Sequence, residues 1–213
     1  MNAVVNNPFF NVVARQSTYR NIAYVWLAFP LGLVYFVLLT TGSALSIGLS
    51  LLWIGLVIAL VFVLSLRGLG NFERLLSTWL LGEPVGMPSA AARETKVWGW
   101  LKSILKDPAT WKGTLFLAVK FPIGLLCWIV SVVSFAVSLA FLFAPLDGGG
   151  AIYLDGWMIE DPTGGFLMAA FGALLLLVTL HVHNAMGAIW RFMARHLLAA
   201  RVEPYTDGSV AAS

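Results

Sequence analysis

The sequence predicts an all-α membrane protein with four transmembrane helices, arranged as two tandem hairpin repeats of the same orientation, with amphipathic interfacial helices on the cytoplasmic side. Composition is the first reason. Of the 213 residues, 11% are charged and 60% are hydrophobic, and the mean hydropathy is +0.87. A water-soluble protein of this size cannot bury so much apolar surface. Four apolar stretches approach the length of about 20 residues that a helix needs to cross a bilayer, at about 22–42, 47–66, 115–144 and 165–182.

An internal repeat is the second reason. Thr18–Arg20 (Thr-Tyr-Arg) precedes Phe29–Leu33 (Phe-Pro-Leu-Gly-Leu), and 92 positions later Thr110–Lys112 (Thr-Trp-Lys) precedes Phe121–Leu125 (Phe-Pro-Ile-Gly-Leu). A second match follows each copy, at an offset of 117, between Gly68–Leu76 and Ala185–Met193. Such self-similarity indicates a duplicated unit. Since each copy holds two spans, both copies enter the membrane in the same direction, related by an axis along the membrane normal.

The repeat divides the chain into two halves and a linker. We expect residues 1–82 to form the first interfacial helix and two spans, and residues 94–200 to form the second set. The segment 83–93 is rich in Gly and Pro, which is typical of a linker. Residues 201–213 are predicted to be a disordered tail.

In the first half, a short interfacial helix is expected within residues 1–20, because this segment mixes Phe and Val with Asn and Arg. The first span is predicted from about Asn21 to Thr41. A tight external turn follows over Thr41–Ser46, and the second span covers about Ile47 to Leu66. The second helix is expected to continue over Asn71–Leu81, where Glu73, Arg74 and Trp79 mark the water boundary.

In the second half, the interfacial helix is expected over Val97–Lys112. Asp107 followed by Pro108 gives an N-cap and a first-turn proline for the third helix. Its span, about 115–143, is longer than the bilayer requires, so it can tilt. The fourth helix is expected to start near Asp161 and Pro162 and to run to about Ala200.

Charge placement predicts the orientation. All 13 Lys and Arg lie in the N-terminal segment, in 67–120, or after residue 190, whereas the loop over 146–163 has none. That loop carries the acidic residues Asp147, Asp155, Glu160 and Asp161. Basic residues stay in the cytoplasm, so we expect a multi-pass protein of the plasma membrane with both termini cytoplasmic. Residues 1–16 show no signal-peptide pattern. The net charge of +3 then favours contact with anionic lipid and not with nucleic acid.

Two prolines within predicted spans are the main hinge candidates. Pro30 and Pro122 each remove a backbone donor and bend a helix, and Gly32 and Gly124 follow them, which permits close approach of a neighbouring backbone. A static kink that shapes the bundle is the simpler interpretation. The alternative is a paired hinge whose angle responds to a ligand or to the bilayer.

A few polar side chains at membrane depth are candidates for contact with a ligand or partner. Lys120 is the one cation that falls within a span, although its ammonium can snorkel to the cytoplasmic headgroups, and we favour that interpretation. The other candidates are His181, His183 and Asn184. On a helix, residues two apart point in nearly opposite directions, so the two histidines cannot chelate one ion. We expect no metal and no cofactor.

Small residues on the third span predict a packing face. Ser131, Ser134 and Ser138 lie three and four apart and share one side of the helix, where small residues let helices approach closely. The sequence contains no Gly-x-Ser-x-Gly, His-Glu-x-x-His or Walker lysine motif. We therefore expect a protein that is not an enzyme.

The repeated phrase also carries a family resemblance. Arg15–Arg20 before Phe29–Gly32, with its second copy at Asp107–Lys112 before Phe121–Gly124, resembles the putative sensor domain family of bacteria and archaea over about residues 9–200. Members are often fused to membrane histidine kinases, whereas this sequence shows no phosphoacceptor helix and no nucleotide-binding segment. The resemblance implies a membrane sensor that signals through a separate partner.

The expected function is thus a non-enzymatic membrane sensor or regulatory module. Besides the lipid bilayer, its expected partner is a separate kinase, a membrane complex or a second copy of the chain. Two alternatives remain: an accessory subunit of a larger membrane complex, and a small transporter or lipid-binding protein. The transporter ranks last because coupled transport normally uses paired intramembrane charges and broken helices.

Overall fold

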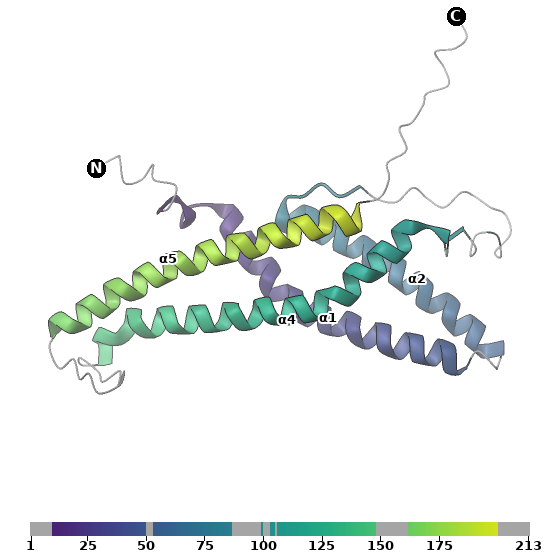
Figure 1. The fold of residues 1–213 in the computed structure, drawn as a ribbon, viewed down its shortest axis with the longest axis horizontal. Coiled ribbons are helices and arrows are strands. Elements are labelled where there is room, and N and C mark those ends of the chain that lie inside the picture. The colour runs from purple at the N-terminus through teal and green to yellow at the C-terminus, as the bar shows by residue number, and fades with distance from the viewer. Residues whose placement is uncertain are drawn as a thin grey trace, which may run out of the picture. The chain divides into compact units, whose positions relative to one another are not determined.

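The computed structural model describes residues 10–49, 53–86, 99, 103, 104, 106–147 and 162–199. All regular elements in these ranges are helical (Figure 1). The chain forms two compact units. Unit 1 combines Met1–Leu33 with Lys120–Trp190, and unit 2 combines Val34–Val119 with Arg191–Ser213. The predicted division into residues 1–82, 83–93, 94–200 and 201–213 stays a prediction.

Helix α1 (Gln16–Gly48) is longer than the sequence predicted. The expected turn over Thr41–Ser46 is wrong, since these residues continue the helix. Two side-chain features explain the continuation: Ser43 Oγ donates to the Thr40 carbonyl at 3.1 Å, and Gly42 packs directly against the Phe62 ring, where a Cβ would not fit. A serine hydroxyl that donates to a carbonyl of its own helix already has a hydrogen-bond partner, so the residue does not require a turn.

Helix α2 (Trp53–Leu76) continues into a π-helical turn, η2 (Ser77–Leu81). The predicted helical continuation over Asn71–Leu81 is confirmed. Gly82 ends it with a φ of 65°, a left-handed conformation that only glycine adopts without strain. The chain after Gly82 is irregular up to residue 86.

Helix α4 (Pro108–Phe143) begins where the sequence predicted. Asp107 caps it, because its Oδ1 accepts the Ala109 N–H at 2.9 Å. A short 3₁₀ turn, η3 (Ala144–Asp147), follows. Helix α5 (Pro162–Met193) also begins at its predicted proline and passes into a second π-helical turn, η4 (Ala194–Leu198).

The interfacial helices are only partly described. Residues 10–20 do not form a separate helix: a 3₁₀ turn, η1, covers Phe10–Val12, and Gln16–Arg20 already belong to α1. The part of this prediction before residue 10 lies outside the described residues. In the segment 97–112, residues 99, 103, 104 and 106 have helical backbone, and the last five belong to α4.

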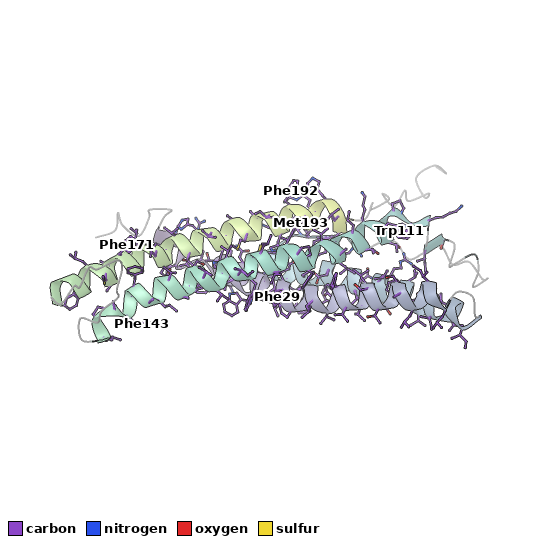
Figure 2. The ribbon with its side chains drawn as sticks, turned by 60° about the horizontal axis from the view of Figure 1, so that its bottom comes forward. Phe29, Trp111, Phe143, Phe171, Phe192 and Met193 are labelled. Atoms are coloured by element: carbon purple, nitrogen blue, oxygen red, sulfur yellow. The ribbon has the colours of Figure 1, made fainter. Side chains whose placement is uncertain are left out.

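Three of the described helices are long and apolar enough to cross a membrane: α1, α4 continued to Leu146, and α5 continued to Leu198. Large apolar side chains project outward from these helices, among them Trp111, Phe143, Phe171 and Phe192 (Figure 2). Apolar side chains exposed on such a scale suit a lipid environment. The chain is therefore a helical membrane protein. The crossing by α2 and the orientation stay predictions, and most of the acidic loop (148–161) lies outside the described residues.

Candidate functional site

The two repeated phrases meet at the crossing of α1 and α4 in unit 1. A Cβ on Gly32 would lie 2.8 Å from Phe121 Cα, and a Cβ on Gly124 would lie 2.9 Å from the Ala28 carbonyl oxygen. No side chain fits at either position unless backbone moves. The contact is reciprocal, because each glycine touches the segment just before the proline of the other helix. The rings of Phe29 and Phe121 stack beside it, with centroids 6.4 Å apart.

The prolines lie inside these helices without ending them. Pro30 and Pro122 free the carbonyls of Trp26 and Ala118, four residues earlier, from their helical hydrogen bonds. The boundary between the two units cuts α1 after Leu33 and α4 before Lys120, within four residues of each proline. Motion at these positions stays a prediction.

Lys120 is completely buried in unit 1 (0% exposed). Its Nζ lies 3.5 Å from Tyr24 Oη, 4.8 Å from the centroid of the Tyr24 ring and 5.8 Å from that of Trp190. The prediction that this ammonium snorkels to the headgroups is therefore wrong. Aromatic faces attract a cation, and they offer it a buried alternative to water.

The aromatic partners of Lys120 come from two further helices. Tyr24 of α1 and Trp190 of α5 are themselves fully buried and pack edge to face, with centroids 5.6 Å apart. The lysine cluster, by which we mean Tyr24, Lys120 and Trp190, thus joins α1, α4 and α5. Sequence reasoning missed the two aromatic residues, because their positions along the chain do not show that they meet Lys120.

Asn184 belongs to a polar contact between α1 and α5. Asn21 Nδ2 donates to Asn184 Oδ1 at 2.8 Å, and Asn184 Nδ2 donates to Thr18 Oγ1 at 3.1 Å. Gly187 makes room for this arrangement, since a Cβ there would lie 2.5 Å from Asn21 Cγ. We call these four residues the amide junction. Its side chains are neutral, and they bond to one another across the two helices.

The predicted serine face of α4 packs on α5. Ser131 Oγ lies 2.7 Å from His183 Nε2, and Ser138 Oγ lies 3.1 Å from Thr179 Oγ1. His183 Nδ1 is 2.8 Å from the Thr179 carbonyl. A carbonyl only accepts, so Nδ1 carries a proton and Nε2 can accept from Ser131. Ser134 Oγ donates to the Ser131 carbonyl at 3.1 Å.

The Ser131–His183 pair has the hydrogen bond of a nucleophile and its base, but both side chains are fully buried. A catalytic serine must be reachable by its substrate, so we regard the pair as a packing contact. His181 lies apart from it, with its Nδ1 2.9 Å from the Leu177 carbonyl. The structure brings His183 to the serine face and does not bring His181 there.

Unit 2 contains buried charges that sequence reasoning placed at the water boundary. Glu73 is 0% exposed and accepts a 2.6 Å hydrogen bond from Tyr35 Oη. Arg74 is 3% exposed; its Nε donates to the Leu198 carbonyl at 2.8 Å and its Nη1 to Asn71 Oδ1 at 2.8 Å. Arg74 therefore caps the end of the last helix. The sequence signal that could have revealed these buried charges is an acid next to a base, Glu73 and Arg74, within an apolar helix.

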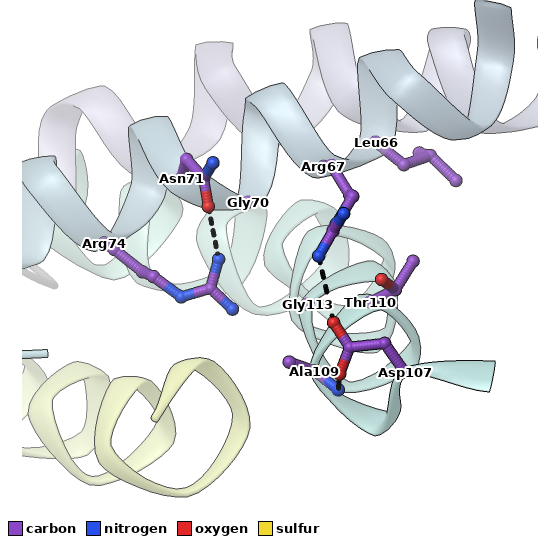
Figure 3. Close-up of a pocket in the computed structure, with 9 residues that line it drawn as sticks. All are labelled: Leu66, Arg67, Gly70, Asn71, Arg74, Asp107, Ala109, Thr110 and Gly113. Atoms are coloured by element: carbon purple, nitrogen blue, oxygen red, sulfur yellow. Dashed lines mark hydrogen bonds and ion pairs between the residues drawn. The ribbon is translucent and has the colours of Figure 1, made fainter. Parts of the chain in front are cut away.

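Further charges lie around Arg74 (Figure 3). Arg67 Nη2 pairs with Asp107 Oδ2 at 3.1 Å. Burial lowers the pKa of Arg74 from its ordinary value, Asp107 opposes this effect, and Arg67 adds to it. At the end of α5, Arg195 holds both carboxylate oxygens of Glu83 at 2.8 Å, and its hydrogen bonds lower the pKa of Glu83.

These features define a class of protein: a helical membrane protein whose few polar and charged side chains join helices. Its family is known. The chain belongs to the family described as "Putative sensor", whose model matches residues 24–198. The resemblance drawn from the repeated phrase is confirmed. Neither a curated protein nor a solved structure matches the chain.

Proposed function

We propose that the chain is a non-enzymatic sensor or regulatory module of the plasma membrane, with both termini in the cytoplasm, that signals through a separate protein partner. The reciprocal crossing at Gly32 and Gly124 carries this proposal. It places two proline-containing helices in backbone contact at the repeated phrase, and the unit boundary passes close to both prolines. Family membership supports the sensing role.

The proposed architecture is a pair of tandem hairpins with four spans. Three correspondences support it. The glycine contacts are reciprocal. The π-helical turns Ser77–Leu81 and Ala194–Leu198 lie 117 positions apart, the offset of the second sequence match. Finally, Tyr35 contacts Glu73 in one half, and Cys127 lies next to Trp190 in the other. Tyr35 and Cys127 are separated by the first offset, 92, and Glu73 and Trp190 by the second, 117.

The proposed mechanism is a change of bend at Pro30 and Pro122. A proline leaves a helical carbonyl without its partner, so the helix bends there at low cost. The change reaches the cytoplasmic side through α1 and α4 and alters the contact between Arg74 and the Leu198 carbonyl at the end of α5. The stimulus, a property of the bilayer or a molecule at its surface, must bind or favour one bent state more strongly.

Replacement of both prolines tests the proposal. The double variant Pro30→Ala, Pro122→Ala restores two helical hydrogen bonds, so the protein should insert normally but lose its response. Pro84→Ala is the matched control, because Pro84 is exposed and lies outside the helices. The readout is the activity of the kinase or regulator that co-purifies with the chain. An unchanged response in the double variant rejects the hinge.

The second candidate function is an accessory subunit of a larger membrane complex. The exposed apolar faces of α1, α4 and α5 favour it, since another membrane protein can cover them as well as lipid does. A stoichiometric integral-membrane partner whose activity does not depend on Pro30 or Pro122 would favour this function over sensing.

A further inference from the structure

Two arginines of α2 and the first turn of α4 enclose a small cavity in unit 2 (Figure 3). Its volume is about 10 Å³, enough for one water-sized group. We call it the arginine pocket, and its lining side chains that bear on the argument are Arg67, Arg74, Asp107, Thr110 and Gly113. Two cations face one carboxylate, so the pocket carries one excess positive charge.

The guanidinium of Arg74 is only partly used by the protein. Its side chain is 97% buried, and Nε and Nη1 have their acceptors in Leu198 and Asn71. Nη2 has no acceptor among the described residues, and it lies 4.0 Å from the position that a Cβ of Gly113 would take. The missing side chain at Gly113 therefore leaves Nη2 facing the cavity.

Thr110 adds a second unused donor. Its Oγ1 is buried and has no hydrogen-bond partner in the described part of the chain. It lies in the first turn of α4, where the positive end of the helix dipole favours a negative charge. A threonine hydroxyl and a guanidinium N–H that point into one cavity suit an oxygen that only accepts hydrogen bonds.

Asp107 does not prevent the binding of an anion. Both of its oxygens are occupied within the protein, Oδ2 by Arg67 and Oδ1 by the Ala109 N–H. The side chains of Arg67 and Asp107 are 19% and 28% exposed, so the mouth of the pocket reaches solvent. An anion can thus approach past the ion pair to the unused donors behind it.

We propose that the arginine pocket binds one oxygen of a phosphate group through Arg74 Nη2 and Thr110 Oγ1, with Arg67 as a third donor at the mouth. The volume admits a single oxygen, so the rest of the phosphate stays outside. Two sources share this chemistry: the headgroup of an anionic phospholipid and free inorganic phosphate. The site does not depend on the sensing role or on the hinge.

Thr110→Val is the most informative variant. Valine keeps the shape and removes a hydroxyl that has no partner, so the unliganded protein should be as stable as the wild type or more stable. The affinity for phosphate should fall at least about tenfold, because a hydrogen bond to a charged group is lost. Gly113→Asn, which fills the cavity, should abolish binding. Lys112→Gln is the matched control: it removes an exposed charge from the same turn.

Two measurements distinguish the sources. Native mass spectrometry of the protein released from nanodiscs of phosphatidylglycerol and phosphatidylcholine reports retained lipid. The shift in melting temperature on addition of inorganic phosphate to pure phosphatidylcholine nanodiscs reports the free anion. The proposal expects one of these signals in the wild type and in Lys112→Gln, and its loss in Thr110→Val and Gly113→Asn. Absence of both signals, or equal signals in all four proteins, overturns it.

Discussion

The amide junction of unit 1 and the arginine pocket of unit 2 fall at corresponding positions of the proposed repeat, but they are built differently. In the junction, Asn21 donates to Asn184, and Asn184 in turn donates to Thr18. All of its groups are neutral. It therefore joins α1 and α5 through hydrogen bonds among its own side chains.

In the arginine pocket, the corresponding positions hold Gly113, Arg67 and Thr110. The glycine leaves space where the other half has Asn21, and the threonine hydroxyl stays without a partner in the described residues. The comparison teaches that a glycine and an arginine in place of the amide pair leave a cavity, which Arg74 and Asp107 also line. The proposed repeat would place two such junctions at matching positions, of which only one needs to be closed for packing.

The glycines of the two regions should respond oppositely to alanine, and this is the largest difference that we expect. Gly187→Ala places a Cβ 2.5 Å from Asn21 Cγ and should cost about 3 kcal/mol through overpacking and the loss of the amide contact. Gly70→Ala meets only Arg74 Nη1 at 3.5 Å and should gain up to about 1 kcal/mol of helix propensity. Unfolding in denaturant measures both. Equal changes in the free energy of unfolding for Gly187→Ala and Gly70→Ala would contradict the expected difference between the two regions.

Loss of the central polar side chain should also affect the two regions unequally. Asn184→Ala leaves the amide of Asn21 and the hydroxyl of Thr18 without their buried partner, so the free energy of unfolding should fall by about 1–2 kcal/mol. Arg67→Ala removes a partly exposed ion pair and should cost less than about 1 kcal/mol. The same denaturant assay applies. A larger loss for Arg67→Ala would mean that the pocket, and not the junction, holds its helices.

The smallest expected effect is a dependence on pH that the Arg195–Glu83 pair shows and the amide junction does not. Because hydrogen bonds from Arg195 lower the pKa of Glu83 in the folded state, their contribution is present above the ordinary carboxyl pKa. It is lost as pH falls through the lowered value. The melting temperature of the wild type should exceed that of Glu83→Gln at neutral pH and converge with it in acid. Asn184→Ala should show no such convergence, and parallel curves for Glu83→Gln would contradict the assignment.

Sequence patterns predicted the helices well where a local signal exists. Asp107–Pro108 and Pro162 mark helix starts, and Gly82 marks an end, because caps and prolines act within a few residues. The wrong predictions concern contacts between side chains that are far apart in the sequence. A periodic pattern does not reveal that Phe62 packs on Gly42, so a turn was expected there. It also does not reveal which side chains surround a charge.

The burial of Lys120, Glu73 and Arg74 illustrates this limit. From the sequence, each charge lies near an end of an apolar stretch, which is equally typical of an interfacial residue. Lys120 contacts Tyr24 and Trp190, and Glu73 contacts Tyr35, only because other helices pack against these charges. The repeated phrase marked Gly32 and Gly124 as matching positions, but the sequence alone does not show that they meet.

The most direct test of the account measures whether α1 and α4 bend at their prolines. Spin labels at Val137 and Trp79, both exposed and in different units, report the distance between units in a Cys127→Ala background. The account predicts that the distance distribution differs between nanodiscs of thin and thick bilayers, and that Pro30→Ala, Pro122→Ala removes the difference while the protein stays folded. Identical distributions in both bilayers, or a difference that survives the loss of both prolines, would contradict it.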